Sequence, residues 1–233
     1  MELEYSVDLI SDLNLDKSSQ FDWTGKPTSL FCVVAGNISS DTSKIKETLE
    51  HLGTTYRGVL YIDGHLEHKD ITKHSTRVEQ LSELCAPIKN VVYMHNHVVV
   101  LNHIAFVAVN GWYGKQTEYE GTLEENFVLT GIQNEDIGYL SQTIRNLQLH
   151  RDAAKIVVVS NSIPADHFLY QTTPRYFIGV EPALSLVMDT DKKVSHWFYG
   201  GNYPHCDTIY NGRRYINNPR MGGQPYWPKR IVI

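Results

Sequence analysis

Residues 7–16 read VDLISDLNLD, and this stretch decides the fold. Val7, Leu9 and Ile10 at its start are typical of a short buried strand, and the polar residues Asp12 and Asn14 stand in the loop that follows. In α/β folds, functional side chains lie at the carboxyl edge of a sheet, where strands run into loops. The stretch therefore predicts a buried strand that carries a carboxylate and an amide to a site.

Four later apolar runs end in a similar way. The polar or glycine-rich segments that follow them are Ala35-Gly36-Asn37, Asp63-Gly64-His65-Leu66-Glu67, Ser160-Asn161-Ser162 and Gly200-Gly201-Asn202-Tyr203. Because strand ends of neighbouring strands meet at one edge of a sheet, we expect these segments to form a single site together with Asp12.

Strand and helix patterns alternate in the first part of the chain. Asp41 offers an N-cap to a helix whose apolar face includes Ile45 and Leu49, and Gly53 predicts its end. Helical spacing returns between Asp70 and Cys85. This alternation predicts parallel strands joined by crossover helices.

The middle of the chain has a different pattern. Three β-rich runs at 91–94, 98–101 and 104–109 are separated by short polar breaks, which are typical of hairpins. We expect a long aromatic loop over 111–126 and a helix capped by Asn134. Asn-Gly at 211–212 predicts another hairpin, so mixed sheets are expected.

Composition bounds the function. The chain has 233 residues, of which 42% are hydrophobic, and this fits one globular domain over residues 1–233. The net charge of -5 argues against a dedicated nucleic-acid binder. Three widely spaced cysteines predict no disulfide framework and a reducing cytoplasm, which is the host cytoplasm if the protein is viral. The sequence shows no secretion signal or membrane-spanning run, so no membrane partner is expected.

The order of the five strand ends resembles the calcineurin-like metallophosphoesterase superfamily. That family has the motifs D-x-H, G-D-x-x-D, G-N-H-E, a histidine after a β-rich strand, and G-H-x-H. The corresponding segments here are Asp12-Leu13-Asn14, Gly36-Asn37-Ile38-Ser39-Ser40-Asp41, Gly64-His65-Leu66-Glu67, Ser160-Asn161-Ser162 and Gly200-Gly201-Asn202-Tyr203. The resemblance covers residues 5–220, and the sequence is similar to phage-encoded members of the superfamily. It implies an α/β fold, a four-layer α/β/β/α sandwich of two mixed sheets flanked by helices.

The resemblance also implies a chemistry, and this sequence departs from it. In the family the motif residues bind two metal ions, usually Mn, Fe, Zn or Ni, whose bridging hydroxide attacks a phosphorus ester. Asp12 alone matches the family's ligand set. The replacements are Asn14 and Asn161 for histidines, Asn37 for the bridging aspartate, His65 for the ligand asparagine, Leu66 for the catalytic histidine, and Gly201 and Tyr203 for the two histidines of G-H-x-H.

These replacements weaken the metal site. Two neighbouring divalent cations repel each other, and anionic bridging ligands make the pair tolerable. Asn37 offers a neutral carbonyl oxygen, Gly201 offers no side chain, and Leu66 has no proton to give. We therefore expect no catalytic residue, no bound metal and no cofactor, and we interpret the chain as a pseudoenzyme that binds a protein partner.

Two alternatives stay open. The first is a metal-dependent phosphatase or phosphodiesterase with a rearranged or single Mn-type site on Asp12, drawing on His65, Glu67 and His68. The second is a nucleotide or small-ligand module in a neutral cleft, with His65 or Arg220 as its cation. The cleft residues are expected to be Asp12, Asn14, Asn37, His65, Asn161, Gly201 and Tyr203. For a protein partner, the candidate contacts are Trp112-Tyr113 and Tyr226-Trp227-Pro228, with ordinary packing as the other explanation.

Overall fold

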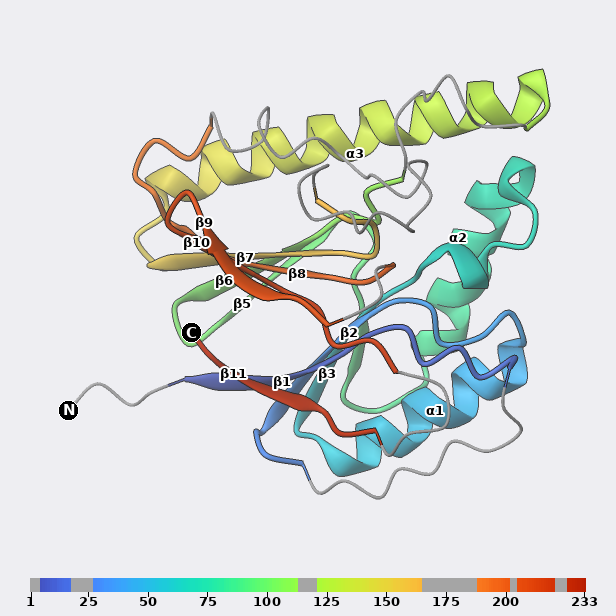
Figure 1. Ribbon diagram of the computed structural model, residues 1–233, viewed down its shortest axis with the longest axis horizontal. Helices are drawn as coiled ribbons and strands as arrows, with labels where there is room; N and C mark the ends of the chain where they lie inside the picture. Colours follow the sequence, from blue (N-terminus) through green and yellow to red (C-terminus); the bar gives the residue numbers. More distant parts are fainter. Residues whose placement is uncertain (1–4, 18–26, 113–120, 165–187, 202–204, 221–225) are drawn as a thin grey trace.

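The computed structural model describes residues 5–17, 27–112, 121–164, 188–201, 205–220 and 226–233. These residues form two mixed β-sheets packed face to face, with helices on the outer face of each sheet (Figure 1). The four-layer α/β/β/α arrangement expected from the sequence is confirmed.

The first sheet has the strand order β11-β1-β2-β3-β4. Strands β1 to β4 run parallel, and β11 lies antiparallel to β1 at one edge. Their bounds are β1 (Ser6–Ile10), β2 (Phe31–Ala35), β3 (Gly58–Ile62), β4 (Val91–Tyr93) and β11 (Lys229–Val232). Because β1, β2 and β3 are parallel neighbours, their following loops leave the sheet side by side.

The second sheet has the order β5-β6-β7-β8-β10-β9. Its inner strands are parallel, and β5 and β9 are antiparallel edge strands. The bounds are β5 (His97–Leu101), β6 (Ile104–Ala108), β7 (Lys155–Ser160), β8 (Val194–Tyr199), β9 (Asp207–Tyr210) and β10 (Arg213–Ile216). The neighbours β7 and β8 therefore also carry their loops to one edge.

Helices cover both sheets on the outside. Helices α1 (Thr42–Thr55) and α2 (His74–Cys85) pack on the first sheet, and α3 (Leu123–Leu149) packs on the second (Figure 1). Two short 3-10 turns, η1 (His65–Glu67) and η2 (Ile71–Lys73), connect β3 to α2. Within the described residues, no helix combines the length and the apolarity that a membrane span requires.

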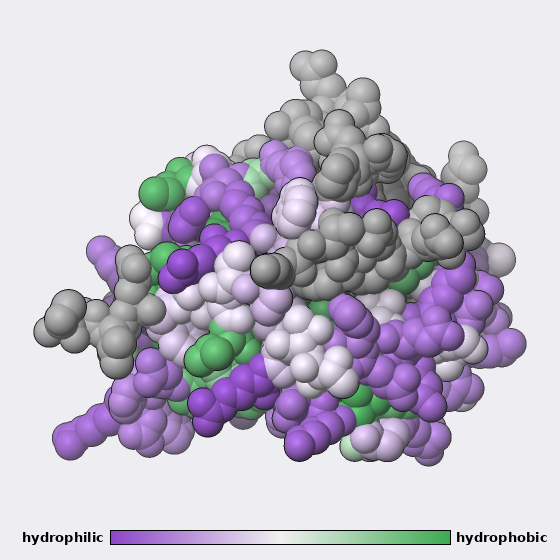
Figure 2. Space-filling view, turned by 90° about the horizontal axis from the view of Figure 1, so that it is seen from below, coloured by the Kyte–Doolittle hydropathy of each residue, from purple (hydrophilic) through white to green (hydrophobic). Residues whose placement is uncertain are grey.

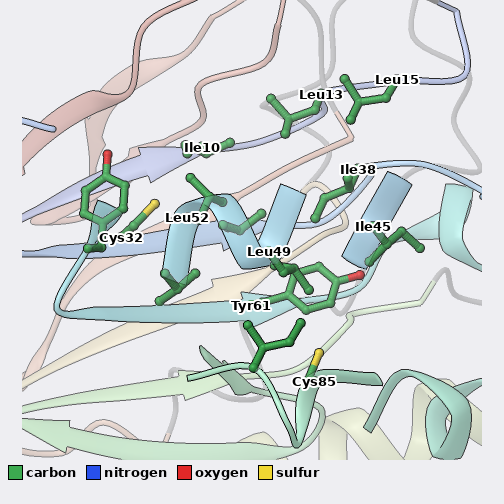
Figure 3. Close-up of a cluster of buried hydrophobic side chains, with 14 of the residues drawn as sticks. Ile10, Leu13, Leu15, Cys32, Ile38, Ile45, Leu49, Leu52, Tyr61 and Cys85 are labelled. Carbon is green, nitrogen blue, oxygen red and sulfur yellow. The ribbon is translucent and has the colours of Figure 1, made fainter. Parts of the chain in front are cut away.

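Apolar side chains fill all three spaces between the four layers. Figure 3 shows the space under α1, where Leu49 and Leu52 lie in one cluster with Ile10 and Tyr61 of the first sheet. Seen from below, the described residues show hydrophilic and intermediate side chains with small hydrophobic patches (Figure 2). Helix α1 is thus held by its apolar face, as expected for an amphipathic helix.

The end of α1 differs from the prediction. Asp41 caps the helix as expected, because its side chain accepts a hydrogen bond from the backbone N–H of Ser43. The helix passes through Gly53 and ends at Thr55. A Cβ atom at Gly53 would lie 2.6 Å from the backbone oxygen of Lys89. This glycine therefore permits close packing against the loop before β4, and it does not end the helix.

The predicted meander of residues 91–109 is wrong in its first part. Residues 91–93 form β4 in the first sheet, whereas β5 and β6 belong to the second sheet. The turn at 95–96 therefore connects two sheets and is not a hairpin. The hairpin lies at Asn102 and His103, whose φ angles of 50° and 64° are those of a type I′ turn. A local pattern marks strands but does not show which sheet each one joins.

Helix α3 begins well before the predicted cap Asn134. Thr122 is the N-cap, and it forms a capping box with Glu125: each side chain accepts a hydrogen bond from the other residue's backbone N–H, at 3.2 and 2.6 Å. Residues 123–126, which we expected in a loop, are therefore helical. The hairpin at 211–212 is confirmed, since β9 and β10 pair antiparallel around it.

Candidate functional site

The loops after β1 and β2 turn sharply at the edge of the first sheet. Asp12, Asn14 and Asn37 have positive φ angles of 52°, 49° and 58°. Aspartate and asparagine adopt this left-handed conformation more readily than most residues with side chains. Gly36 also has a positive φ, and a Cβ there would lie 2.5 Å from Nδ2 of Asn161. The local sequence therefore allows backbone bends that bring the loops together.

A hydrogen-bonded centre joins four of the strand ends, those of β1, β2, β3 and β8. Oδ1 of Asp12 accepts from Nδ2 of Asn37 at 2.8 Å and from the backbone N–H of Gly201 at 2.9 Å. Oδ1 of Asn37 accepts from the backbone N–H of Leu66 at 3.0 Å. The amide of Asn37 thus uses both of its ends to link the loops after β1 and β3.

Asn161 joins the second sheet to the first. Its side chain is fully buried, and its Nδ2 donates to the backbone oxygen of Ala35 at 3.0 Å. Its Oδ1 accepts from the backbone N–H of His65 at 3.3 Å. A Cβ at Gly64 or Gly200 would lie 2.7 or 2.8 Å from this side chain. The two glycines therefore leave the space that the Asn161 amide fills.

Glu67 fixes the loops from behind. Its carboxylate accepts from the backbone N–H groups of Asn37, Ile38 and Gly64 at 3.1, 2.7 and 2.9 Å. Burial raises the pKa of Glu67 to about 7, although these hydrogen bonds act in the opposite direction. This side chain is turned toward the backbone and braces the loops after β2 and β3.

Electrostatically, the centre is weakly anionic. Burial raises the pKa of Asp12 to about 6, and hydrogen bonds from Asn37 and Gly201 partly oppose this rise. Burial lowers the pKa of His65 to about 3, which favours a neutral imidazole at the position expected to offer a cation to phosphate. Arg220 donates from Nη1 to the backbone oxygen of Leu13 at 3.3 Å.

The structure brings most of the predicted cleft residues together. Asp12, Asn14, Asn37, His65, Asn161 and Gly201 lie in one network: Asn14 joins it through a bond from Nδ2 to the backbone oxygen of Asp12 at 2.9 Å. Leu66 contributes its backbone N–H. Tyr203 and Asn202 lie outside the described residues.

A cluster of buried rings beside this centre was not predicted. His68 stacks on His74 with ring centroids 4.9 Å apart, and Trp112 stands edge-on to His65 at 4.9 Å and to His68 at 5.2 Å. His68 Nε2 is hydrogen-bonded to Asp63, which lies at the end of β3. Burial favours the neutral acid, but the contact with His68 lowers the pKa of Asp63 well below its usual range. The only sequence signal was the spacing of histidines after β3.

Trp112 is held in place from α3. The buried Asp136 accepts from the backbone N–H groups of Gly111 and Trp112 at 2.8 and 3.4 Å. Burial raises the pKa of Asp136 to about 7. The predicted surface contact at Trp112 is wrong, because this ring is 3% exposed and packs on the histidines. Tyr113 lies outside the described residues.

The donor set does not fit a pair of divalent cations. The described centre offers the Asp12 carboxylate, and the amide nitrogen of Asn37 points at that carboxylate from the position where the family has a bridging aspartate. His65, Glu67 and His68 contact Trp112, backbone N–H groups and Asp63, and so they do not converge. Among the described residues, no three His, Cys, Asp or Glu side chains are grouped so that they could hold a metal.

Sequence comparison finds no matching family model and no matching curated protein. Solved structures share the fold. Phosphopantetheinyl hydrolase from Mycobacterium tuberculosis is similar with a TM-score of 0.68 and 16% identity, over 94% of this chain and 90% of that one. GAP50, described as the anchor in the inner membrane complex of Plasmodium, has a TM-score of 0.53 and 15% identity, over 94% and 72%.

A third similar structure is a 5'-nucleotidase from Staphylococcus aureus in complex with alpha-ketoglutarate. It has a TM-score of 0.51 and 10% identity, over 93% of this chain and 49% of that one. At these identities the likeness concerns the fold alone. The described residues therefore share the α/β fold of these metallophosphoesterase-like structures, and their two mixed sheets carry an asparagine-rich centre at one common edge.

Proposed function

We propose that this chain is a metallophosphoesterase-like pseudoenzyme that acts by binding a protein partner in the cytoplasm. One observation carries the first half of this proposal: Nδ2 of Asn37 donates to Oδ1 of Asp12 at 2.8 Å. A bridging ligand presents an anionic oxygen to the cations, whereas here a donor N–H faces the carboxylate. The chemistry of this contact supports an inactive centre.

The surroundings support the same reading. Leu66 stands where the resemblance places the histidine that protonates the leaving group, and it meets the centre through its backbone N–H. His65 is neutral and edge-on to Trp112. With these contacts, neither Leu66 nor His65 is arranged to deliver a proton to a leaving oxygen, because a general acid must lie about 3 Å from it.

A metal and activity measurement tests this half. The purified unaltered chain should contain substoichiometric transition metal, and with added Mn it should hydrolyse a generic phosphodiester no faster than the Asp12→Asn variant. Elemental analysis that finds two metal ions per chain would overturn the proposal. So would hydrolysis that disappears in Asp12→Asn, because this would show a working site on the retained carboxylate.

Partner binding is supported by the fold comparison and by one surface. GAP50 shares the fold and is described as an anchor, so a protein of this fold can have an anchoring role. On the present chain, Ile209, Tyr210 and Trp227 are 74%, 45% and 56% exposed. We call these three residues the β9 surface. Exposed aromatic residues are enriched at interface cores, and β9 is an edge strand whose outer backbone groups can pair with another strand.

The two segments of the β9 surface are tied together. Lys229, two residues after Trp227, forms an ion pair of 2.7 Å with Asp207 at the start of β9. The other predicted aromatic of the tail, Tyr226, is 6% exposed, and its hydroxyl donates to the backbone oxygen of Asn218 at 2.6 Å. The prediction that Tyr226 contacts a partner is therefore wrong, while Trp227 stays a candidate.

A matched pair of variants tests this surface. Once a partner has been identified, Ile209→Ser with Trp227→Ser should weaken its binding about tenfold or more, as expected for loss of an aromatic anchor. Phe127→Ser with Leu149→Ser alters exposed apolar residues on α3 and serves as the control. Equal affinity of the two double variants would exclude the β9 surface as the contact.

A further inference from the structure

A second concave site lies beside the altered centre. It is a pocket of about 210 Å³ bounded by the segment from η1 to α2 and by the residue that precedes the cap of α1. The lining residues used below are Ser40, Lys69, Asp70, Lys73, Thr76 and Arg77. Asp12, Asn14, Asn37 and Asn161 do not line it, whereas Glu67 and His68 do, so the pocket adjoins the centre described above.

Arg77 is held rigidly at this pocket. Its Nε donates to the backbone oxygen of Glu67 at 2.8 Å, and its Nη1 donates to Thr42 Oγ1 at 3.1 Å and to Gln80 Oε1 at 3.3 Å. These neutral acceptors position the guanidinium without neutralising its charge. A preorganised guanidinium loses little freedom on binding and suits planar or tetrahedral oxyanions.

The charge at the pocket is positive. Lys69, Lys73 and Arg77 supply three cations, and Asp70, 3.2 Å from Lys73, supplies one anion. Glu67 also borders the pocket, but its carboxylate is turned inward to backbone N–H groups. In a chain with a net charge of -5, a concave site lined by three cations against the carboxylates of Asp70 and the inward-turned Glu67 is locally positive and favours an anion.

Neutral donors complete the lining. The hydroxyls of Ser40 and Thr76 border the pocket, and Thr42, which Arg77 contacts, is the first residue of the 14-residue helix α1.

We propose that this pocket binds a phosphate group, with Arg77, Lys69 and Lys73 as its cationic contacts. The group can belong to a free small anion or to a phosphorylated segment of a partner protein, since both present the same oxyanion. The proposed contacts Lys69, Lys73 and Arg77 are not residues of the centre at Asp12, so phosphate binding here does not depend on whether that centre is catalytically silent.

The full-length ¹⁵N-labelled chain is titrated at constant ionic strength with three probes: inorganic phosphate, a phosphoserine peptide, and the same peptide without phosphate. We expect saturable shifts of the Lys69 and Lys73 amide signals and of the Arg77 Nε signal, with affinity near 1 mM for inorganic phosphate. Tighter binding of the phosphopeptide would identify a partner segment as the source, and equal or weaker binding would identify a small anion. Equal shifts with the unphosphorylated peptide would overturn the proposal.

Charge-matched variants separate a site from general attraction. Lys69→Gln with Lys73→Gln should weaken phosphate binding about tenfold. Lys89→Gln with Lys155→Gln changes the net charge equally at exposed positions outside the pocket and should leave binding within about twofold. The same loss in both doubles, or in neither, would overturn the proposal. Lys69→Gln alone, at an exposed side chain, gives the same test if the first double fails to fold.

Discussion

Replacing Asn37 by aspartate introduces the carboxylate that the G-D-x-x-D motif has at this position. It also turns the attractive contact between Asn37 and Asp12 into a repulsive one. In the parent chain, Nδ2 of Asn37 donates to Oδ1 of Asp12 at 2.8 Å, and both side chains are buried. In the variant, a carboxylate oxygen of the introduced aspartate would face Oδ1 of Asp12, whose other contact described above is the neutral N–H of Gly201. Asn37→Asp should therefore cost stability in a way that depends on pH.

The size of the effect follows from charge and distance. Two unit charges about 4 Å apart at an effective dielectric near 20 repel by about 4 kcal/mol, and the lost hydrogen bond adds about 1 kcal/mol. A proton shared by the pair removes most of the repulsion. We expect a loss of about 3–5 kcal/mol at pH 8 and about 1 kcal/mol near pH 5.

The sign of the pH dependence follows from proton binding. Burial already raises the pKa of Asp12 to about 6, and a second carboxylate raises the pKa of the pair further. The folded variant then keeps a proton that the unfolded chain releases from about pH 4 upward. Since the folded state binds more protons, the free energy of unfolding falls as pH rises.

Urea denaturation at pH 5 and pH 8 measures this loss. The control is Asn102→Asp, the same chemical change at a residue with a similar φ of 50° in an exposed hairpin turn. Added Mn should raise the melting temperature of Asn37→Asp more than that of the parent, because the variant offers the cation two carboxylates. If Asn37→Asp at pH 8 loses no more stability than the control, the assigned contact with Asp12 is wrong.

Further substitutions test the packing around the site. Gly36→Ala should lower the free energy of unfolding by about 2 kcal/mol or more, because the φ of Gly36 is 75° and a Cβ would lie 2.5 Å from Nδ2 of Asn161. Gly138→Ala in α3 should raise it by about 0.5–1 kcal/mol, because a Cβ there would meet no atom within 4 Å. Urea denaturation should therefore give changes of opposite sign for the two variants, and changes of the same sign would contradict this packing. Leu140→Ala at a fully buried position should cost about 2–5 kcal/mol and Leu123→Ala at an exposed one about 0.5 or less, and similar losses would contradict the packing of α3. Burial raises the pKa of Asp136 to about 7, so its protonated folded form makes parent stability fall between about pH 4 and 7; Asp136→Asn should flatten this slope in thermal melts, and unchanged slopes would refute it.

The convergence of the strand ends could be predicted from the sequence. Parallel strands carry their loops to one edge, and each apolar run ended in a distinct polar segment, so Asp12, Asn37 and Asn161 were expected together. Their pairing could not be predicted, because an asparagine amide has a donor end and an acceptor end whose orientation depends on all its neighbours. The bond from Asn37 to Asp12 is a property of the folded loops.

The start of α3 and the turn at 95–96 were both predicted wrongly, for different reasons. Thr122 and Glu125 form a capping box that was present in the sequence, but the aromatic, glycine-bearing segment before it predicted a loop through residue 126. The residues at 95–96 read as a hairpin turn because strand pattern is local, while the choice between two sheets depends on contacts far along the chain. Trp112 was assigned to the surface for a similar reason: its burial depends on Asp136 of α3.

The asparagines explain how the loops can stay together without cations. A metal ion ties loops by accepting electron pairs from several of them, whereas an amide ties two loops by donating at one end and accepting at the other. Asn161 links the backbone oxygen of Ala35 to the N–H of His65, and Asn37 links Asp12 to the N–H of Leu66. Apolar residues at these two positions would leave buried backbone groups and a carboxylate without these partners, at a cost of about 1–3 kcal/mol for each group. The side chains of Asn37 and Asn161 therefore hold these loops together through hydrogen bonds at both ends of each amide.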